Sequence, residues 1–254
     1  MVDKEELKTV LKKLRTEEDL TKIEERLRPL LQNVDPETLS LAEQELIDEG
    51  FSPEEIRRLC DIHLKVVAVK EEEQSLEESH PLSILKSEHE IILNNLRILE
   101  DVLSKIRLNN SPEKLNEELK RLEAVIELLL EAENHHRREE MSLFPRLEEY
   151  GISGPPNVMR MEHDDLRSRK KALKSLLDEH SKLDSKHLAN KVYEIGNYIT
   201  IVLRDHIFKE NNILYPLALK VVQEGEWKKI KDEFDSIGYC CFTPGVKAHR
   251  EHHY

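Results

Sequence analysis

The sequence predicts an all-α protein in which a small helical domain precedes an antiparallel four-helix bundle. Three observations support this fold class. Of 254 residues only 7 are glycine and 5% are aromatic, whereas 36% are charged, a composition typical of long helices with little sheet. Apolar residues recur at the three- and four-residue spacing of a helix through most of the chain. In the second half of the chain, stretches rich in Asn, Gly, Ser and Pro separate four long helical patterns.

The N-terminal residues 1–75 are expected to form a small domain of short helices. Pro36 and Pro53 each follow a residue that caps helices well, and proline is tolerated at the first helical position. The acidic stretch 70–79 has almost no apolar periodicity. We therefore place the domain boundary in this stretch.

The bundle is expected over residues 80–222, with its four helices following one another along the chain. The first begins near His80 and ends before an Asn-Asn-Ser-Pro turn. The second runs from that turn to about Glu148. A break rich in glycine and proline begins at Gly151 and precedes the third helix, and the fourth starts near Asp184. Short connections between long helices favour antiparallel neighbours.

The C-terminal residues 223–254 are too apolar for a free tail. Trp227, Ile230 and Phe234 recur at helical spacing. The sequence therefore predicts a short helix in this tail that folds back on one of the domains.

Two stretches of the bundle repeat one motif. His135 is followed four residues later by Glu139, and His206 is followed four residues later by Glu210. In both, a Leu-aromatic-Pro sequence follows at the same distance. Positions i and i+4 of a helix lie on the same face, so each stretch can present an imidazole and a carboxylate to one point.

Each of these stretches has a partner helix that carries a further histidine. His89 lies 46 residues before His135, and His163 lies 43 residues before His206. This order indicates an internal duplication of a helical hairpin. Buried carboxylates are costly and repel one another, and a cation between them removes both problems. The sequence therefore predicts a metal site with six ligands: His89, His135, Glu139, His163, His206 and Glu210.

The paired motif and its spacing resemble the hemerythrin-like (HHE cation-binding) family over roughly residues 80–222. The resemblance implies a four-helix bundle that holds a non-haem di-iron centre. Imidazole and carboxylate without thiolate suit iron or manganese, and zinc is a plausible substitute. With four histidines, two bridging glutamates and a bridging oxygen, about two coordination positions stay open for a small exogenous ligand.

The second helix also offers an overlapping pair, His136 and Glu140. Aligning Pro145 with Pro216 places His135 on His206. This alignment favours the first pair as ligands, and it leaves His136 and Glu140 as neighbours of the site or as additional ligands.

The chain differs from the oxygen-carrying hemerythrins in lacking their fifth histidine ligand. In those proteins the fifth histidine lies one helical turn after the ligand on the third helix, and this chain has Arg167 at that position. His80 is a candidate replacement, but it lies nine residues before His89, about 13 Å along a straight helix. His80 can therefore coordinate only if the helix breaks near Pro81.

Residues 42–50 and 59–63 resemble a small helical domain of unknown function (the DUF438 type) that is found ahead of hemerythrin-like domains. Cys60 and His63 lie within the second stretch, but two ligands are too few for a structural zinc site. The chain has 3 cysteines, which form no disulfide framework in a chain of this length. We expect Cys60 and the neighbouring Cys240 and Cys241 to be reduced thiols.

Three functions are consistent with such a site. The first is a protein that binds or senses oxygen or nitric oxide in signalling or stress response, with the N-terminal domain relaying the signal to a protein partner. The second is a di-iron enzyme or iron donor for peroxide or nitric-oxide detoxification or for iron–sulfur cluster repair. The third is a helical protein-interaction module in which the metal ion only stabilises the bundle. No additional acid–base or nucleophilic group supports turnover, which favours binding over catalysis.

Charge and hydropathy limit the classes of binding partner and the cellular location that we expect. The formal net charge is −13 and no basic stripe interrupts it, which argues against nucleic acid. The sequence has no run of 18 apolar residues and begins with a charged segment, so a cytoplasmic protein without membrane contact is expected. The oligomeric state stays open, and a homo-oligomer is compatible with the sequence.

Overall fold

The computed structural model describes residues 8, 9, 12, 34, 42, 45, 46, 49–51, 76–108, 112–180 and 184–245. No strand occurs among these residues, and the predicted all-α fold class is confirmed. No helix in the described part is long and apolar enough to cross a membrane. The chain divides into two compact units. One comprises Met1–Ser75, Leu143–Met161 and Lys209–Glu224, and the other comprises Leu76–Ser142, Glu162–Phe208 and Gly225–Tyr254.

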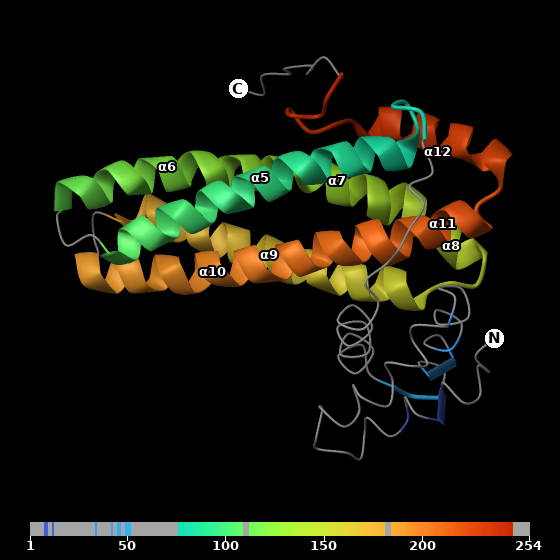
Figure 1. Ribbon diagram of the computed structural model, residues 1–254, viewed down its shortest axis with the longest axis horizontal. Coiled ribbons are helices and arrows are strands. Elements are labelled where there is room, and N and C mark those ends of the chain that lie inside the picture. The colour runs from blue at the N-terminus through green and yellow to red at the C-terminus, as the bar shows by residue number, and fades with distance from the viewer. Residues whose placement is uncertain are drawn as a thin grey trace. The chain divides into compact units, whose positions relative to one another are not determined.

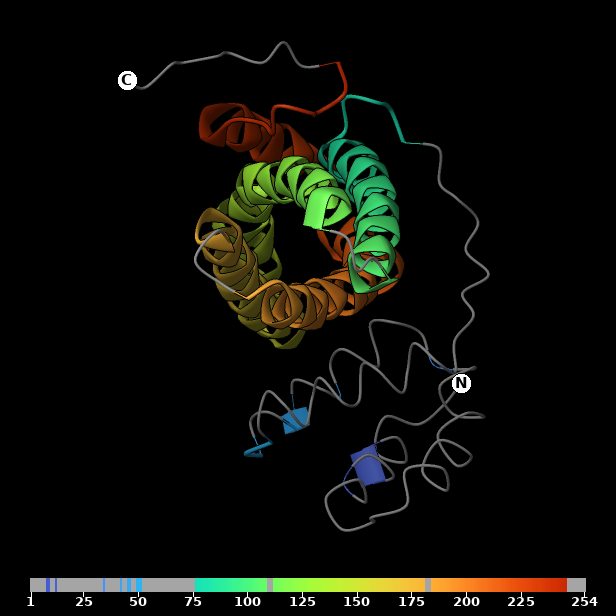
Figure 2. The same cartoon turned by 90° about the vertical axis from the view of Figure 1, so that its left-hand side faces the viewer.

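Four long helices form the bundle. They are α5 (Pro81–Leu108), α6 (Pro112–Glu131), α9 (Gly154–Asp178) and α10 (Ser185–Lys209). They run side by side in Figure 1, and the view along them in Figure 2 shows that they surround a common core. Apolar side chains from all four fill this core; among them are Leu99, Leu103, Leu122, Ile126, Leu166, Leu173, Val192 and Ile199.

The second and fourth helices of the bundle change their winding near their ends. The elements that follow α6 are α7 (Glu133–Arg138), η2 (Glu139–Leu143) and α8 (Phe144–Glu149), and those that follow α10 are η4 (Glu210–Leu214) and α11 (Tyr215–Val221). Both η2 and η4 are π-helical turns. Each begins at the glutamate of the motif, and the aromatic-Pro pair opens the helix that follows.

The proline of each motif explains the position of the π turn. Proline has no N–H to donate to the carbonyl four residues earlier, and its ring clashes with that carbonyl. In a π turn the hydrogen bonds run to the fifth residue instead, so a proline just beyond the turn is accommodated without breaking the helix. Such turns are frequent at functional sites, and these two begin at candidate metal ligands.

Two basic side chains of α9 stabilise the break between α6 and α7. Lys170 is 2% exposed, and its Nζ donates a hydrogen bond of 3.0 Å to the carbonyl of Leu129 in the last turn of α6. Arg167 donates from Nε to both carboxylate oxygens of Glu133, the first residue of α7, at 2.9 and 3.0 Å. These contacts fix the direction of α7, which carries His135.

Lys170 gives the stability of the metal-free protein a predictable pH dependence. Burial lowers its pKa from 10.5 to about 8; Arg167 acts in the same direction, and Glu133 and Cys240 oppose it. At pH values between these two pKa values, Lys170 is protonated in the unfolded chain but not in the folded protein. The free energy of unfolding therefore rises with pH. From pH 7 to 9.5 Lys170 should contribute about 2 kcal/mol to this rise.

Urea unfolding of the metal-free wild type and of Lys170→Met at both pH values measures this contribution. The variant should lack the extra rise in the free energy of unfolding. An equal pH dependence in the two proteins would contradict a buried lysine with a depressed pKa.

Gly196 allows α10 to approach α5 closely. A Cβ at this position would lie 2.7 Å from Leu103 Cδ2 and 2.8 Å from Cδ1, inside normal contact distance, and Leu103 is only 2% exposed. Gly196→Val should therefore lower the free energy of unfolding by about 1–3 kcal/mol through overpacking. Thermal unfolding measures the effect. Gly225→Ala is the control, because a Cβ there has nothing within 4 Å, and equal stability of Gly196→Val and wild type would refute the close packing.

The C-terminal segment packs on the bundle. Helix α12 (Glu224–Ile237) buries Trp227, Ile230 and Phe234, and Figure 1 shows it beside α5 and α7. The Trp227 ring lies 4.6 Å from the ring of His80 at the start of α5. Beyond α12, Cys240 is buried and Cys241 is exposed, and both are free thiols.

Candidate metal centre

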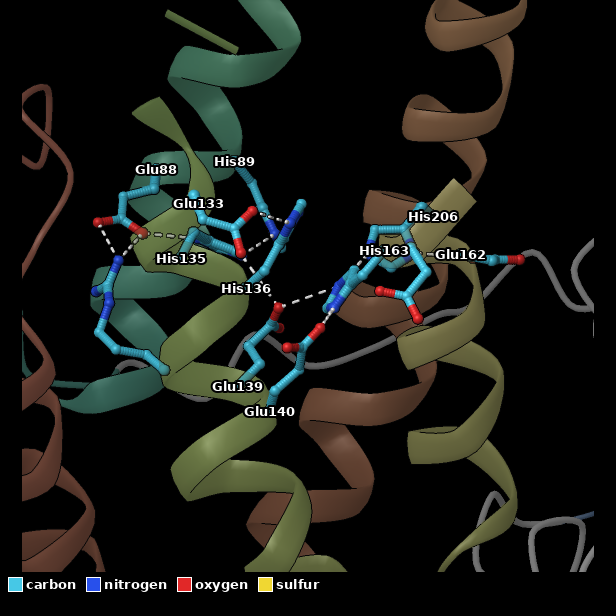
Figure 3. Close-up of polar contacts among 12 residues, drawn as sticks. Glu88, His89, Glu133, His135, His136, Glu139, Glu140, Glu162, His163 and His206 are labelled. Atoms are coloured by element: carbon cyan, nitrogen blue, oxygen red, sulfur yellow. Dashed lines mark hydrogen bonds and ion pairs between the residues drawn. The ribbon is translucent and has the colours of Figure 1, made fainter. Parts of the chain in front are cut away.

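The first histidine pair joins α5 and α7. His89 and His135, each 1% exposed, face one another with their Nε2 atoms 3.0 Å apart. On the other side of its ring, His135 Nδ1 lies 2.7 Å from Oε2 of Glu88. Figure 3 shows these three side chains together on one side of the centre.

The second pair joins α9 and α10 in the same manner. The Nε2 atoms of His163 and His206 are 2.9 Å apart. His163 Nδ1 lies 2.7 Å from Oε1 of Glu140, and His206 Nδ1 lies 2.8 Å from Oε2 of Glu162. Figure 3 shows both rings opposite the first pair.

The hydrogen bonds of the second pair define the protons on both rings. An ionised carboxylate only accepts hydrogen bonds, so each Nδ1 that faces one carries the proton. In a neutral imidazole the Nε2 atom then holds a lone pair. Two lone pairs facing one another at 2.9 Å repel, whereas a cation between them is attracted to both. Histidine ligands of metals are oriented by carboxylates in this way, so the donor set fits a metal ion.

Glu139 lies between the two histidine pairs. Its Oε2 is 3.6 Å from Nε2 of His135 and 3.5 Å from Nε2 of His163. Potential ligand atoms of Glu139, His163 and Glu210 all lie within 4.8 Å of one another, and those of His89, His135 and Glu210 form a second such group. Glu210 belongs to both groups. The structure thus brings together all six residues that the sequence singles out.

His136 lies against the second pair. Its ring stacks on that of His163 with centroids 4.0 Å apart and 15° between the planes. A third group with ligand atoms within 4.8 Å consists of His136, His163 and His206. Burial is the largest cause that holds the pKa of His136 well below its usual value, and the charge of Lys170 acts in the same direction. His136 is therefore a neutral imidazole at the edge of the centre.

Glu140 lies behind the ring of His163 and supports it. It is 2.7 Å from Nδ1 of His163, and it accepts two hydrogen bonds from Nη2 of Arg167, at 2.9 and 3.0 Å. Partial burial opposes ionisation of Glu140, but the hydrogen bond from His163 and the charge of Arg167 lower its pKa below the usual value. The arginine in the position of the fifth hemerythrin histidine thus holds the carboxylate that orients His163.

His80 is placed away from the histidine pairs. The backbone N–H of Leu82 donates to His80 Nδ1 at 3.2 Å, and the ring contacts Trp227. Helix α5 continues from Pro81 to Leu108, and the N–H of Ile84 bonds to the carbonyl of His80 at 3.1 Å. The break that would fold His80 back is not present here, and His80 is in none of the three groups formed by described residues.

Glu88 and Glu162 were not expected from the sequence to be partners of the candidate ligands His135 and His206. Each directly precedes the histidine of its own helix, His89 or His163, and supports the histidine of the next helix in the chain. The repeated Glu-His dipeptide was the available signal. Burial raises the pKa of Glu88, but the hydrogen bond from His135 and the charge of Arg138 outweigh it, and the pKa falls to about 2. Glu88 is therefore ionised.

The suggested pair Cys60 and His63 lies outside the described residues.

Comparisons with known proteins identify the family of the chain. The Hemerythrin HHE cation binding domain family matches residues 80–218, more than half of the chain, and the family of unknown function DUF438 matches residues 7–73. The iron-sulfur cluster repair protein YtfE of Musicola paradisiaca (strain Ech703) is 34% identical over 105 residues, which are 39% of this chain and 47% of that protein. The chain thus spans about half the length of this relative. With its duplicated histidine pairs and the family match over the bundle, the chain belongs to the hemerythrin HHE cation-binding family and carries a DUF438 region before the bundle.

Proposed function

We propose that this protein holds a non-haem di-iron centre that binds a small diatomic ligand, oxygen or nitric oxide, in signalling or stress response. The observation that carries the proposal is the pairing of the histidines. His89 with His135 forms one pair of Nε2 donors, and His163 with His206 forms the other. Two such pairs support two metal ions better than one, because each pair presents two Nε2 atoms of its own.

The two glutamates support a bridged centre. Oε2 of Glu139 lies 3.6 Å from Nε2 of His135 and 3.5 Å from Nε2 of His163, and Glu210 is grouped with the first pair and with His163. In this proposal Glu139 and Glu210 would hold the irons together with the histidines and would neutralise part of their charge. Iron, when bound, supplies redox activity and open coordination positions for a small ligand. Manganese and zinc suit the same donors and are expected as substitutes.

Burial supports a small ligand rather than a large one. The six proposed metal ligands are each at most 1% exposed. Ile92 and Leu166 follow His89 and His163 by three residues, Ile207 directly follows His206, and all three belong to the buried apolar core of the bundle. A dry, enclosed centre suits an uncharged diatomic molecule and disfavours a bulky substrate.

A second candidate function is iron donation or enzymatic chemistry in peroxide or nitric-oxide detoxification or in iron–sulfur cluster repair. It is favoured by the relative YtfE, whose name is that of an iron-sulfur cluster repair protein. Because the similarity covers only 39% of this chain, it supports a related use of iron rather than the same activity. In the first proposal the DUF438 region relays the signal to a protein partner. We place either function in the cytoplasm, where thiols such as those of Cys240 and Cys241 stay reduced.

Metal analysis of anaerobically purified protein, with optical spectra before and after oxygen or nitric oxide is added, tests these proposals. Two irons per chain and a reversible spectral change support the first function. Consumption of many equivalents of peroxide or nitric oxide, or transfer of iron to a cluster-deficient protein, supports the second. A metal-loaded centre whose spectrum responds to no added ligand indicates an interaction module in which the metal only stabilises the bundle. Absence of bound metal contradicts the proposed metal site. His80→Ala is the control and should leave the spectrum unchanged.

A further inference from the structure

The residues after α12 contact side chains that lie next to the candidate ligands His89 and His135. We name residues 239–243 the C-terminal clasp; they lie beyond residues 80–218, which the hemerythrin family matches. Asn134 Nδ2 donates to the carbonyl of Tyr239 at 3.0 Å. The guanidinium of Arg138 lies 4.8 Å from the centre of the Tyr239 ring, and its Nη2 is 3.7 Å from Cys240 Sγ. The clasp is therefore attached to α7 immediately beside His135.

The clasp also contacts the carboxylate that orients His135. The hydroxyl of Thr243 donates to Oε1 of Glu88. Nη2 of Arg138 donates to the same carboxylate at 2.7 and 2.6 Å. Oε2 of Glu88 accepts from His135. Because Glu88 is 0% exposed and Thr243 is 4% exposed, these bonds are shielded from bulk solvent. Thr243 therefore helps to fix the plane of the carboxylate that His135 follows.

This arrangement makes the two halves of the duplicated bundle different. Glu162 supports His206 as Glu88 supports His135, and Lys209 occupies the motif position of Arg138. The contacts of the clasp described above all reach the first half, which contains His89 and His135. The clasp, which lies outside the repeat, thus contacts the residues around the first histidine pair.

We propose that Thr243 is a positioning residue for the metal ligand His135, acting through Glu88, and that metal binding and docking of the clasp stabilise one another. The proposal rests on the proposed function in that it requires a metal at His135. A fixed Glu88 keeps the Nδ1 proton of His135 in place and its Nε2 lone pair directed at the metal. By thermodynamic reciprocity, a metal that binds better when the clasp is docked must also hold the clasp in place.

Substitution of Thr243 tests the positioning role. Full-length wild type, Thr243→Val and Thr243→Ser are loaded with Fe²⁺ without oxygen, and the iron is titrated against a chelator. Valine keeps the size of threonine but lacks the hydroxyl, so the affinity of one iron should fall by about 10- to 100-fold. Serine restores the hydroxyl and should retain affinity close to that of wild type. Ser236→Ala is the matched control, because this exposed hydroxyl on α12 donates to the backbone carbonyl of Asp232 within its own helix.

Labelling of the Cys240 thiol tests the reciprocal effect. Cys240 is 3% exposed, so it reacts when the clasp opens. In a chain carrying Cys60→Ser and Cys241→Ser, Fe²⁺ should slow the labelling of Cys240 by about fivefold or more. The Thr243→Val change should remove this protection. Asn134→Leu, which loses the bond to Tyr239, provides a second opening variant if Thr243→Val does not fold.

The outcomes separate this inference from the proposed function. Wild-type iron affinity in Thr243→Val, or labelling of Cys240 that is indifferent to iron, overturns the role of the clasp while the metal centre stands. Failure of the wild type itself to bind metal overturns the proposed function and this inference with it. Equal loss of iron in Thr243→Val and Thr243→Ser also overturns the inference, because the hydroxyl would then have no role.

Discussion

Glu139→Gln is expected to remove most of the increase in melting temperature that iron gives to the wild type. Glu139 is fully buried between the histidine pairs, and the substitution keeps the size of the side chain but removes the negative charge that holds the metal. A ligand present at a free concentration about 100 times its dissociation constant stabilises the folded state by about 2.7 kcal/mol. In a protein of this size that corresponds to roughly 5–10 °C, and the variant should lose most of it together with iron.

Calorimetry with and without Fe²⁺ in the absence of oxygen, combined with iron analysis of the same samples, measures both effects. Glu90→Gln is the control, since Glu90 is an exposed glutamate beside the ligand His89. If Glu139→Gln keeps both the iron content and the thermal shift of the wild type, Glu139 does not bridge the metals.

Arg138→Met should give the largest loss of stability in the metal-free protein. Arg138 and Glu88 are both 0% exposed and are joined by hydrogen bonds of 2.7 and 2.6 Å. The variant leaves Glu88 as a buried charge without its main counter-ion, which costs about 3–5 kcal/mol. Urea unfolding should show this loss. The double variant Arg138→Met with Glu88→Gln should regain part of it, because the remaining charge is then neutralised.

Arg204→Met is the matched control. Its ion pair with Glu100 also joins two helices, at 2.9 Å, but both side chains are more than 40% exposed. Loss of such a pair costs at most about 1 kcal/mol. Equal losses in the two arginine variants would show that the Arg138–Glu88 pair has no special role in the core.

The sequence predicted the parts of the site that depend on helical geometry alone. The i, i+4 spacing of His135 and Glu139 on one face, and its repetition at His206 and Glu210, follow from a regular helix. The histidine of each partner helix followed from the duplication. The start of α5 near His80 and the all-helical fold were likewise expected from periodicity and proline placement.

Other features required three-dimensional information. The partner of each histidine lies on a different helix, as with Glu88 and His135, so no periodicity within one helix identifies it. The π turns were not predicted, because a single extra residue leaves the apolar pattern nearly unchanged over five residues. The contact of Thr243 with Glu88 spans 155 positions, and it depends on how α12 packs rather than on any local pattern.

The two π turns also occupy equivalent positions of the internal repeat. A π turn accommodates one residue more than the α-helical turn it replaces, and here both begin at the same glutamate of the motif. One insertion that preceded the doubling of the hairpin accounts for both, whereas two later insertions would each have had to occur at the same residue. Each hairpin carries three of the six candidate ligands, so a protein with a single hairpin would need a second polypeptide to complete the proposed centre.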